Sequence, residues 1–214
     1  MNRPAKPRPI RNLFVPILLG ASLLIAGCGQ QDGSEARQTP PLAGADIGGP
    51  FELVDKNGQT VRWADFAGKY RVVYFGYTYC PDICPLDVQR MARGLRQLDK
   101  DDPAKAAKIQ AIFITVDPER DTPDKVGEFA AAFSDDIIGL TGTPDQVKQA
   151  ADNFRVYYEK GPDSGAGGYL VNHSNITYLF DPDGEPLATL PTDVNDGVSL
   201  ERRLSWTSPP FTRQ

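Results

Sequence analysis

Residues 71–85 read RVVYFGYTYCPDICP. The first seven, Arg71 to Tyr77, form a nearly continuous run of β-branched and aromatic residues, which is typical of a central strand buried on both faces. Leu86 to Leu98 follow, with apolar residues at close to helical spacing. The stretch therefore predicts a buried strand that leads through a loop with two cysteines into a helix.

Strand and helix signals alternate after this point. Ile109 to Val116 predicts a second central strand. The pairs Thr122-Pro123 and Thr143-Pro144 each predict a helix start with a threonine N-cap, and Gln146 completes a capping box in the second. The later predicted elements are strands at 155–159, 176–180 and 186–190, a turn at 181–184 and a short helix at 200–206.

A hairpin precedes these elements. Residues 51–54 and 59–63 flank Asn57-Gly58, which is a strong signal for a tight β-turn. A βαβ crossover followed by a helix and a second β-hairpin is the plan of thioredoxin, and the order of the predicted elements matches it. The predicted fold class is therefore α/β, a thioredoxin-like fold with an added N-terminal β-hairpin, in a domain from residue 47 to residue 206.

The first 27 residues have the pattern of a signal peptide. Four basic residues precede an uncharged apolar run, Leu13 to Ala26, and no acidic residue occurs before Asp32. The run is short and interrupted by proline, which disfavours a membrane-spanning helix. It ends in LIAGC, residues 24–28, which resembles a bacterial lipobox and implies lipidation of Cys28. An uncleaved anchor is the alternative, and both predict a membrane-anchored domain in a bacterial cell envelope, outside the cytoplasm.

Composition limits the class of partner. Residues 28–46 contain almost nothing that could enter a core and are predicted to be a flexible tether, and 207–214 are predicted to be a C-terminal tail. Four of the 23 basic residues lie in the leader, so its removal leaves 19 basic and 28 acidic side chains, a net charge of −9. Such an acidic domain has no electrostatic reason to bind nucleic acid, and its field favours cations and basic partner surfaces.

Soft metal ligands are few in this domain. With Cys28 assigned to the lipobox, Cys80 and Cys84 remain; His173 is the single histidine, and Met91 is predicted to belong to the core face of its helix. The two cysteines lie between a central strand and a helix, at the edge where open α/β sheets place their sites. Backbone N–H groups at a helix start stabilise a thiolate and lower the pKa of a cysteine.

Two thiolates and one imidazole suit Cu(I) in a trigonal site, or Cu(II) with an added ligand. Zinc accepts the same residues but requires a fourth ligand. Two alternatives stay open: a structural disulfide between the cysteines, which an oxidising compartment favours, and a structural role for His173. The histidine is placed on the approach to the strand at 176–180, and its distance in sequence from the cysteines does not establish a contact.

Several segments carry a resemblance to a known family. They are FGYTYCPDICP at 75–85, TVDPERDTP at 115–123, GLTGTP at 139–144, and His173-Ser174 followed by DPDG at 181–184. Together they resemble the Sco/SenC copper proteins, in register from residue 46 to residue 191. The resemblance implies a thioredoxin fold, copper held by Cys80, Cys84 and His173, and a role in assembling the dinuclear CuA centre of cytochrome c oxidase. The implied partners are the CuA subunit of the oxidase and another periplasmic copper carrier.

The resemblance also implies roles for neighbouring residues. Asp117 is implied as an electrostatic neighbour of the site, or equally as an acid that caps the end of a strand. Many relatives carry aspartate where this chain has Asn172, which removes a negative charge beside the imidazole, although a backbone contact can orient the ring as well. Some relatives carry histidine where this chain has Tyr79, so that nitrogen ligand is missing here.

Two functions compete. The first is a membrane-tethered copper metallochaperone that delivers copper to the CuA centre of a respiratory cytochrome c oxidase. The second is a thiol-disulfide oxidoreductase that reduces the cysteines of the oxidase copper site, with Cys80 and Cys84 as the reactive pair. His173 distinguishes them, because copper binding needs it and disulfide exchange does not strictly require it. A peroxiredoxin-like peroxidase is disfavoured, because it needs threonine or serine where Tyr77 stands.

Overall fold

The computed structural model describes residues 39–190 except 164, 166 and 167. The predicted signal peptide, Cys28, the first part of the predicted tether, the helix predicted at 200–206 and the C-terminal tail lie outside the described residues. Among the described residues, no helix has both the length and the hydrophobicity needed to cross a membrane.

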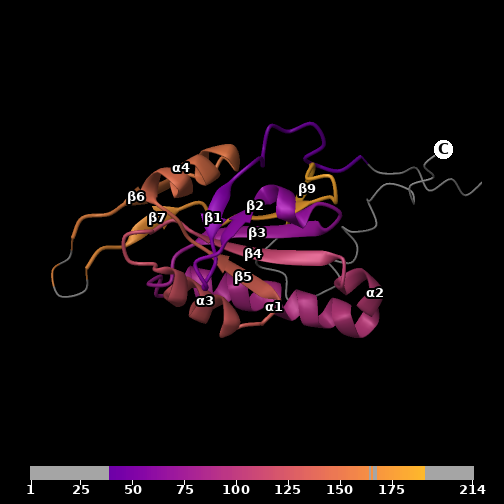
Figure 1. Ribbon diagram of the computed structural model, residues 1–214, viewed down its shortest axis with the longest axis horizontal. Helices are drawn as coiled ribbons and strands as arrows, with labels where there is room; N and C mark the ends of the chain where they lie inside the picture. The colour runs from indigo at the N-terminus through magenta and orange to yellow at the C-terminus, as the bar shows by residue number, and fades with distance from the viewer. Residues whose placement is uncertain (1–38, 164, 166–167, 191–214) are drawn as a thin grey trace, which may run out of the picture. The chain divides into compact units, whose positions relative to one another are not determined.

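A five-stranded sheet forms the centre of the domain (Figure 1), with the strand order β5-β4-β3-β8-β9. Strands β3 (Tyr70–Gly76), β4 (Ile109–Thr115) and β5 (Ile137–Leu140) are parallel. Strands β8 (Thr177–Phe180) and β9 (Pro186–Leu190) form an antiparallel hairpin that extends the sheet beside β3. The two long central strands predicted from the sequence are both confirmed.

Helices connect the parallel strands and cover both faces of the sheet. The long helix α1 (Ile83–Asp101) and the single turn α2 (Pro103–Ala106) link β3 to β4, and α3 (Pro123–Ala131) links β4 to β5. Helix α4 (Pro144–Asn153) follows β5 and lies on the opposite side of the sheet from α1 and α3 (Figure 1). Both predicted threonine–proline starts are helix starts, and the predicted capping box is present at α4. This is the predicted thioredoxin-like arrangement.

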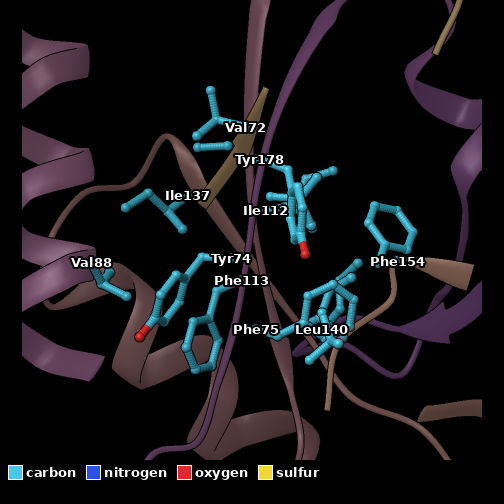
Figure 2. Packing of buried hydrophobic residues seen from close by; sticks show 14 of the residues in the cluster. Val72, Tyr74, Phe75, Val88, Ile112, Phe113, Ile137, Leu140, Phe154 and Tyr178 are labelled. Atoms are coloured by element: carbon cyan, nitrogen blue, oxygen red, sulfur yellow. The ribbon is translucent and has the colours of Figure 1, made fainter. Parts of the chain in front are cut away.

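The central strand β3 is buried on both faces because successive side chains point to opposite sides of the sheet. Tyr74 lies with Phe113 and Val88 on the side covered by α1, whereas Phe75 packs against Phe154 on the other side (Figure 2). All five side chains are almost inaccessible to solvent. This two-sided burial explains why the strand has no polar alternation in its sequence.

Two small antiparallel pairs complete the structure. Strands β1 (Glu52–Val54) and β2 (Thr60–Arg62) form the predicted N-terminal hairpin, with Gly58 in the left-handed region at φ 71°. A 3₁₀ turn, η1 (Trp63–Phe66), follows β2. Strands β6 (Tyr158–Lys160) and β7 (Val171–His173) form the second pair.

The second pair corrects one predicted strand and adds another. The strand predicted at 155–159 begins three residues later, because Arg155 adopts a left-handed φ of 56° after α4 and turns the chain before pairing begins. His173 lies shortly before β8, as the sequence predicted, and it ends β7, a strand that the sequence did not predict; its register partner is Tyr158. The pairing with β6 fixes the backbone that presents the imidazole.

Part of the predicted tether contacts the domain. The Leu42 N–H donates a 3.0 Å hydrogen bond to the carbonyl oxygen of Leu187 on β9, and the Leu42 side chain packs against the core. Arg155 forms an ion pair with Asp46. The described packing therefore begins before Ile47, where the sequence places the start of the domain.

Candidate metal centre

The two cysteines lie where β3 gives way to α1. Cys80 is in the connecting loop and is half-buried, whereas Cys84 lies in the first turn of α1 and is completely buried. The Cys84 N–H points to the Cys80 Sγ atom at 3.4 Å, so the start of the helix donates to the sulfur of Cys80. Both cysteines are free thiols in this structure.

Gly76, the last residue of β3, makes room for the Cys84 sulfur. A β-carbon at this position would lie 3.1 Å from Cys84 Sγ and 2.9 Å from the ring of Tyr74. These distances are shorter than normal van der Waals contacts, so a side chain here would displace the sulfur or the ring. The glycine therefore allows the helix to bring Cys84 against the end of the strand.

His173 reaches the same place from a distant part of the sequence. Its Nε2 atom lies 3.2 Å from Cys84 Sγ. The two sulfur atoms and one imidazole nitrogen all lie within 4.8 Å of one another. The structure therefore brings together the three residues that the sequence singled out, in a group that can hold one metal ion.

A backbone carbonyl orients the imidazole. The His173 Nδ1 atom lies 3.0 Å from the carbonyl oxygen of Ser174, and a carbonyl can only accept a hydrogen bond. Nδ1 therefore carries the ring proton and Nε2 presents its lone pair to the cysteines, as a metal ligand must. Asn172 is exposed, so the backbone rather than an acidic side chain fixes this tautomer.

The two thiols differ strongly in acidity. A hydrogen bond from Cys84 lowers the pKa of Cys80 to about 3, assisted by the backbone N–H groups of Asp82 and Cys84 and opposed by partial burial. The same hydrogen bond and deep burial raise the pKa of Cys84. Without metal, Cys80 is therefore the thiolate, and Cys84 holds the proton that the pair shares.

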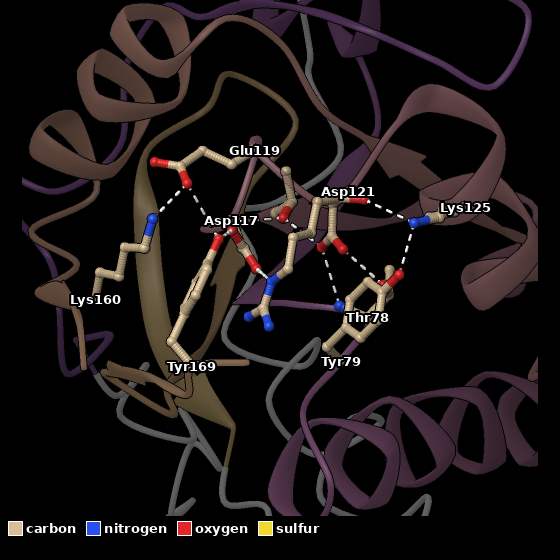
Figure 3. A network of polar contacts seen from close by, with 10 residues as sticks. Thr78, Tyr79, Asp117, Glu119, Asp121, Lys125, Lys160 and Tyr169 are labelled. Atoms are coloured by element: carbon tan, nitrogen blue, oxygen red, sulfur yellow. Dashed lines mark hydrogen bonds and ion pairs between the residues drawn. The ribbon is translucent and has the colours of Figure 1, made fainter. Parts of the chain in front are cut away.

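Asp117 is connected to the candidate metal centre indirectly, through intervening side chains. Its carboxylate accepts hydrogen bonds from the Tyr169 hydroxyl at 2.7 Å and from Arg120 Nε at 2.5 Å (Figure 3). The Arg120 guanidinium lies 5.8 Å from the ring centroid of Tyr77, and that ring meets His173 edge-on at 5.8 Å. Asp117 is thus connected to the imidazole through Arg120 and Tyr77. Its backbone also closes the turn after β4, so both interpretations of this residue have a structural basis.

A second buried acid, Asp121, holds the start of the cysteine loop. Its carboxylate accepts hydrogen bonds from the Thr78 N–H at 2.9 Å, the Thr78 hydroxyl at 2.6 Å and the Thr115 hydroxyl at 2.6 Å (Figure 3). Desolvation raises the pKa of Asp121. These bonds join the loop after β3 to the end of β4 and fix the backbone two residues before Cys80.

Tyr79 is held on the outside of the same loop. Its hydroxyl accepts a 2.6 Å hydrogen bond from Lys125, and the Arg120 guanidinium lies 4.8 Å from its ring centroid. The ring nevertheless remains about half exposed beside Cys80. Tyr79 therefore borders the site without supplying a nitrogen ligand.

Sequence reasoning missed a buried pair beside Cys84. The Tyr74 hydroxyl donates a 3.1 Å hydrogen bond to Asp87, and both residues are 1% exposed. Burial is the largest of the effects that raise the pKa of Tyr74. Asp87 follows Cys84 by three positions and precedes the buried Val88 on α1. An acidic residue on the core-facing side of a predicted helix was the sequence feature that could have indicated this buried pair.

Comparison with known proteins agrees with this architecture. The family model SCO1/SenC matches residues 39–206. This chain belongs to the SCO1/SenC family. It is 37% identical over 187 residues to the SCO2 homolog of Bos taurus, covering 85% of this chain and 70% of that protein. It is 34% identical over 190 residues to the human SCO1 homolog, covering 86% of this chain and 62% of that protein. Both relatives are described as mitochondrial.

Solved structures of Sco proteins superpose on the domain. Copper-bound ScoI of Bradyrhizobium japonicum matches with a TM-score of 0.68 and 35% identity, covering 75% of this chain and 99% of the other. Yeast Sco1 matches with a TM-score of 0.67 and 36% identity, covering 74% of this chain and 95% of the other. These matches confirm the family and the thioredoxin-like fold that the sequence predicted.

Proposed function

We propose that this protein is a membrane-tethered copper metallochaperone that delivers copper to the CuA centre of a respiratory cytochrome c oxidase. The observation that carries the proposal is the convergence of Cys80, Cys84 and His173 within 4.8 Å. Solved Sco relatives are described with copper bound, and BsSco is described as a member of the Sco family of cytochrome c oxidase assembly proteins. Copper is here the cargo, and the donor set of two sulfurs and one imidazole is soft enough to prefer it.

Each side chain has a distinct part in copper uptake. Cys80 offers a thiolate in advance, and His173 offers a lone pair whose direction the Ser174 carbonyl fixes. Cys84 must lose its proton to become the third ligand, so uptake of one copper ion releases a proton from this thiol. Partial exposure of Cys80 leaves the site open on one side, where a donor or acceptor protein can exchange ligands with it.

The direct test is anaerobic titration of the reduced full-length protein, in detergent, with Cu(I) and a competing chelator. The proposal predicts one copper per chain, and loss of tight binding in Cys80→Ser, Cys84→Ser and His173→Ala. A His173→Ala protein that binds copper as tightly as the unmodified protein would exclude His173 as a ligand. Transfer is then measured by mixing the copper-loaded protein with a soluble, reduced CuA domain and following copper in each protein after separation.

The competing function is reduction of the cysteines of the oxidase copper site. The unequal pKa values of the two thiols support it. The Cys80 thiolate attacks one sulfur of the target disulfide and expels the other as a thiolate; Cys84, after losing its proton, then attacks Cys80 Sγ and releases the second target thiol. Two electrons pass to the target, and Cys80 and Cys84 become a disulfide. His173→Ala separates the two functions, because it is expected to abolish copper binding and to preserve this exchange.

The cellular location is part of the proposal and rests on the leader. We place the protein in a bacterial cell envelope, anchored to a membrane by lipid on Cys28, where it receives copper from another periplasmic carrier. Metabolic labelling with a fatty acid analogue tests the anchor. Labelling is expected for the unmodified protein and is expected to be lost in Cys28→Ala, whereas labelling that persists in Cys28→Ala would exclude this cysteine as the lipidated residue.

A further inference from the structure

The hairpin that carries His173 is separate from the central sheet. Strands β6 and β7 pair with each other, and in the described part of the chain neither joins the five-stranded sheet. The chain enters β6 and leaves β7 at the end where His173 lies. Backbone pairing therefore fixes the shape of this hairpin, whereas side chains place its opposite end against the rest of the domain.

Tyr169, at that opposite end, packs on Arg120 in the loop between β4 and α3. The guanidinium carbon of Arg120 lies 3.6 Å from the centroid of the Tyr169 ring. Asp117 joins the two (Figure 3), because one of its oxygens accepts a 2.7 Å hydrogen bond from the Tyr169 hydroxyl and the other accepts a 2.5 Å hydrogen bond from Arg120 Nε. The Asp117 N–H donates to the Thr115 hydroxyl at 2.9 Å, so the group is attached to the end of β4.

Burial makes this the stronger of two links between the hairpin and the loop. The Arg120 side chain is 19% exposed and the Asp117 side chain is 3% exposed, and a cation over an aromatic ring is stabilised more when water is excluded. Lys160 of the same hairpin forms an ion pair with Glu119, but both of these side chains are at least half exposed. Exposed ion pairs contribute little, so the Arg120–Tyr169 contact is the main link.

Arg120 also lies beside the cysteine loop. Its guanidinium carbon is 4.8 Å from the ring centroid of Tyr79, the residue before Cys80, and 5.8 Å from that of Tyr77. The Tyr77 ring in turn meets the His173 ring edge-on at 5.8 Å. The Arg120 Nη2 atom is buried and has no hydrogen-bond partner among the described residues, so aromatic rings hold this side of the guanidinium. One cation thus lies between the hairpin that carries His173 and the loop that carries Cys80.

We propose that Arg120 and Tyr169 are positioning residues that hold His173 within bonding distance of a copper ion bound by Cys80 and Cys84. Strand β7 begins two residues after Tyr169 and ends at His173, so separation of Tyr169 from Arg120 frees the strand that presents the imidazole. The copper site then lacks its third ligand for part of the time. This inference deepens the proposed function and rests on copper binding at the same site.

Two variants break the contact and leave all three candidate ligands in place. Arg120→Met removes the guanidinium, and Tyr169→Leu removes the ring and the hydroxyl. Each is expected to weaken Cu(I) binding by about tenfold, which is at the low end for residues that orient a metal ligand. The measurement is anaerobic competition for Cu(I) between a chelator and the reduced full-length protein in detergent, with unfolding followed on the same samples.

The matched controls make the same chemical changes elsewhere. Arg62→Met removes an arginine that forms an ion pair with Glu52 in the N-terminal hairpin. Tyr157→Leu removes an exposed tyrosine next to β6, whose hydroxyl bonds to Glu159 two residues further along the same chain segment. Neither side chain links the β6–β7 hairpin to the loop of Arg120, so neither control is expected to change the Cu(I) affinity.

The same two substitutions in a His173→Ala chain separate positioning of the histidine from a general effect. The two cysteines are expected to bind Cu(I) more weakly without the imidazole, and a weaker chelator measures that affinity. Arg120→Met and Tyr169→Leu are expected to leave it unchanged, because the group that they position is absent. An effect through the cysteine loop or through overall stability would instead lower the affinity in both backgrounds.

Each outcome decides between these possibilities. No weakening in either variant, or equal weakening with and without His173, would overturn the positioning role, while tight binding by the unmodified chain keeps the proposed function intact. Weakening in only one variant would overturn the role of the other residue. If a variant fails to fold, Tyr169→Phe keeps the ring and is expected to give a smaller loss that again requires His173. Failure of the unmodified chain to bind copper would overturn both the proposed function and this inference.

Discussion

Replacement of Gly76 by alanine is expected to destabilise the protein because the new methyl group has no space. The added β-carbon would lie 2.9 Å from the Tyr74 ring, 3.1 Å from Cys84 Sγ and 3.1 Å from the Phe113 ring. Both rings are fixed in central strands, so the overlap cannot be relieved by rotation of a surface side chain. Overpacking of this kind costs about 1–3 kcal/mol. For a domain of this size that is about 2–12 °C in melting temperature.

A glycine in α1 provides the matched control. A β-carbon on Gly94 would meet nothing within 4 Å, and glycine inside a helix is less favourable than alanine by about 0.5–1 kcal/mol. Gly94→Ala is therefore expected to stabilise the protein, whereas Gly76→Ala is expected to destabilise it. The two substitutions make the same chemical change on either side of the cysteine loop.

Denaturant unfolding and copper competition measure the two consequences. We expect Gly76→Ala to lower the free energy of unfolding of the metal-free protein and also to weaken copper binding, because Cys84 Sγ is one of the atoms that must move. Gly94→Ala is expected to leave copper affinity unchanged. A Gly76→Ala protein as stable as the unmodified one would refute the close approach of strand, ring and sulfur on which this description of the site depends.

Further predictions concern Asp121 and the two thiols. Asp121→Ala leaves the Thr78 N–H without its acceptor and is expected to lower the free energy of unfolding by about 3 kcal/mol, whereas the exposed Asp135→Ala is expected to change it little; equal effects would contradict the buried network. Because the pKa of Asp121 is raised in the folded state, its protonated form is favoured there. The stability contributed by this shift is present below the unfolded pKa and is lost as pH rises through the folded pKa. In unfolding measurements, Asp121→Asn is therefore expected to lower the free energy of unfolding by less at pH 7 than at about pH 4. Since the pKa of Cys80 is lowered to about 3, its alkylation by iodoacetamide is expected to proceed at a rate independent of pH between about pH 5 and 8, with Cys84 reacting far more slowly. Mass spectrometry of the modified peptides checks this, and a rate at Cys80 that rises tenfold per pH unit would contradict it.

The central sheet was predicted well because a strand that is buried on both faces has a continuous run of apolar residues. β3 and β4 lie within one residue of the predicted limits, and both are continuous apolar runs covered on two faces. The β6–β7 pair was harder, because each strand has three residues and its pairing depends on a left-handed Arg155. No periodic pattern encodes such a turn in a non-glycine residue.

The site was predictable to the level of residue types but not of contacts. Cys80, Cys84 and His173 stood out because the domain has so few soft ligands, and the spacing of 89 residues between Cys84 and His173 carried no information about distance. Tyr74 was interpreted only as part of a buried strand, because the partner of its hydroxyl depends on how α1 is rotated against β3. Lipidation of Cys28 and the cellular location stay predictions, since these residues lie outside the described part.

The three candidate ligands differ in how tightly the surrounding residues hold their side chains and in how accessible they are. Cys84 is enclosed by Gly76 and Tyr74, and the Ser174 carbonyl fixes the ring of His173. Cys80 alone combines partial exposure with a thiolate at neutral pH. Copper transfer and disulfide exchange both begin with an attack on, or by, the most accessible sulfur, so both must start at Cys80. The two proposed functions therefore share their first step and diverge at the second, where Cys84 either stays bound to copper or attacks the Cys80 sulfur. His173 takes part in the first of these routes and is dispensable in the second, which is why its substitution separates them.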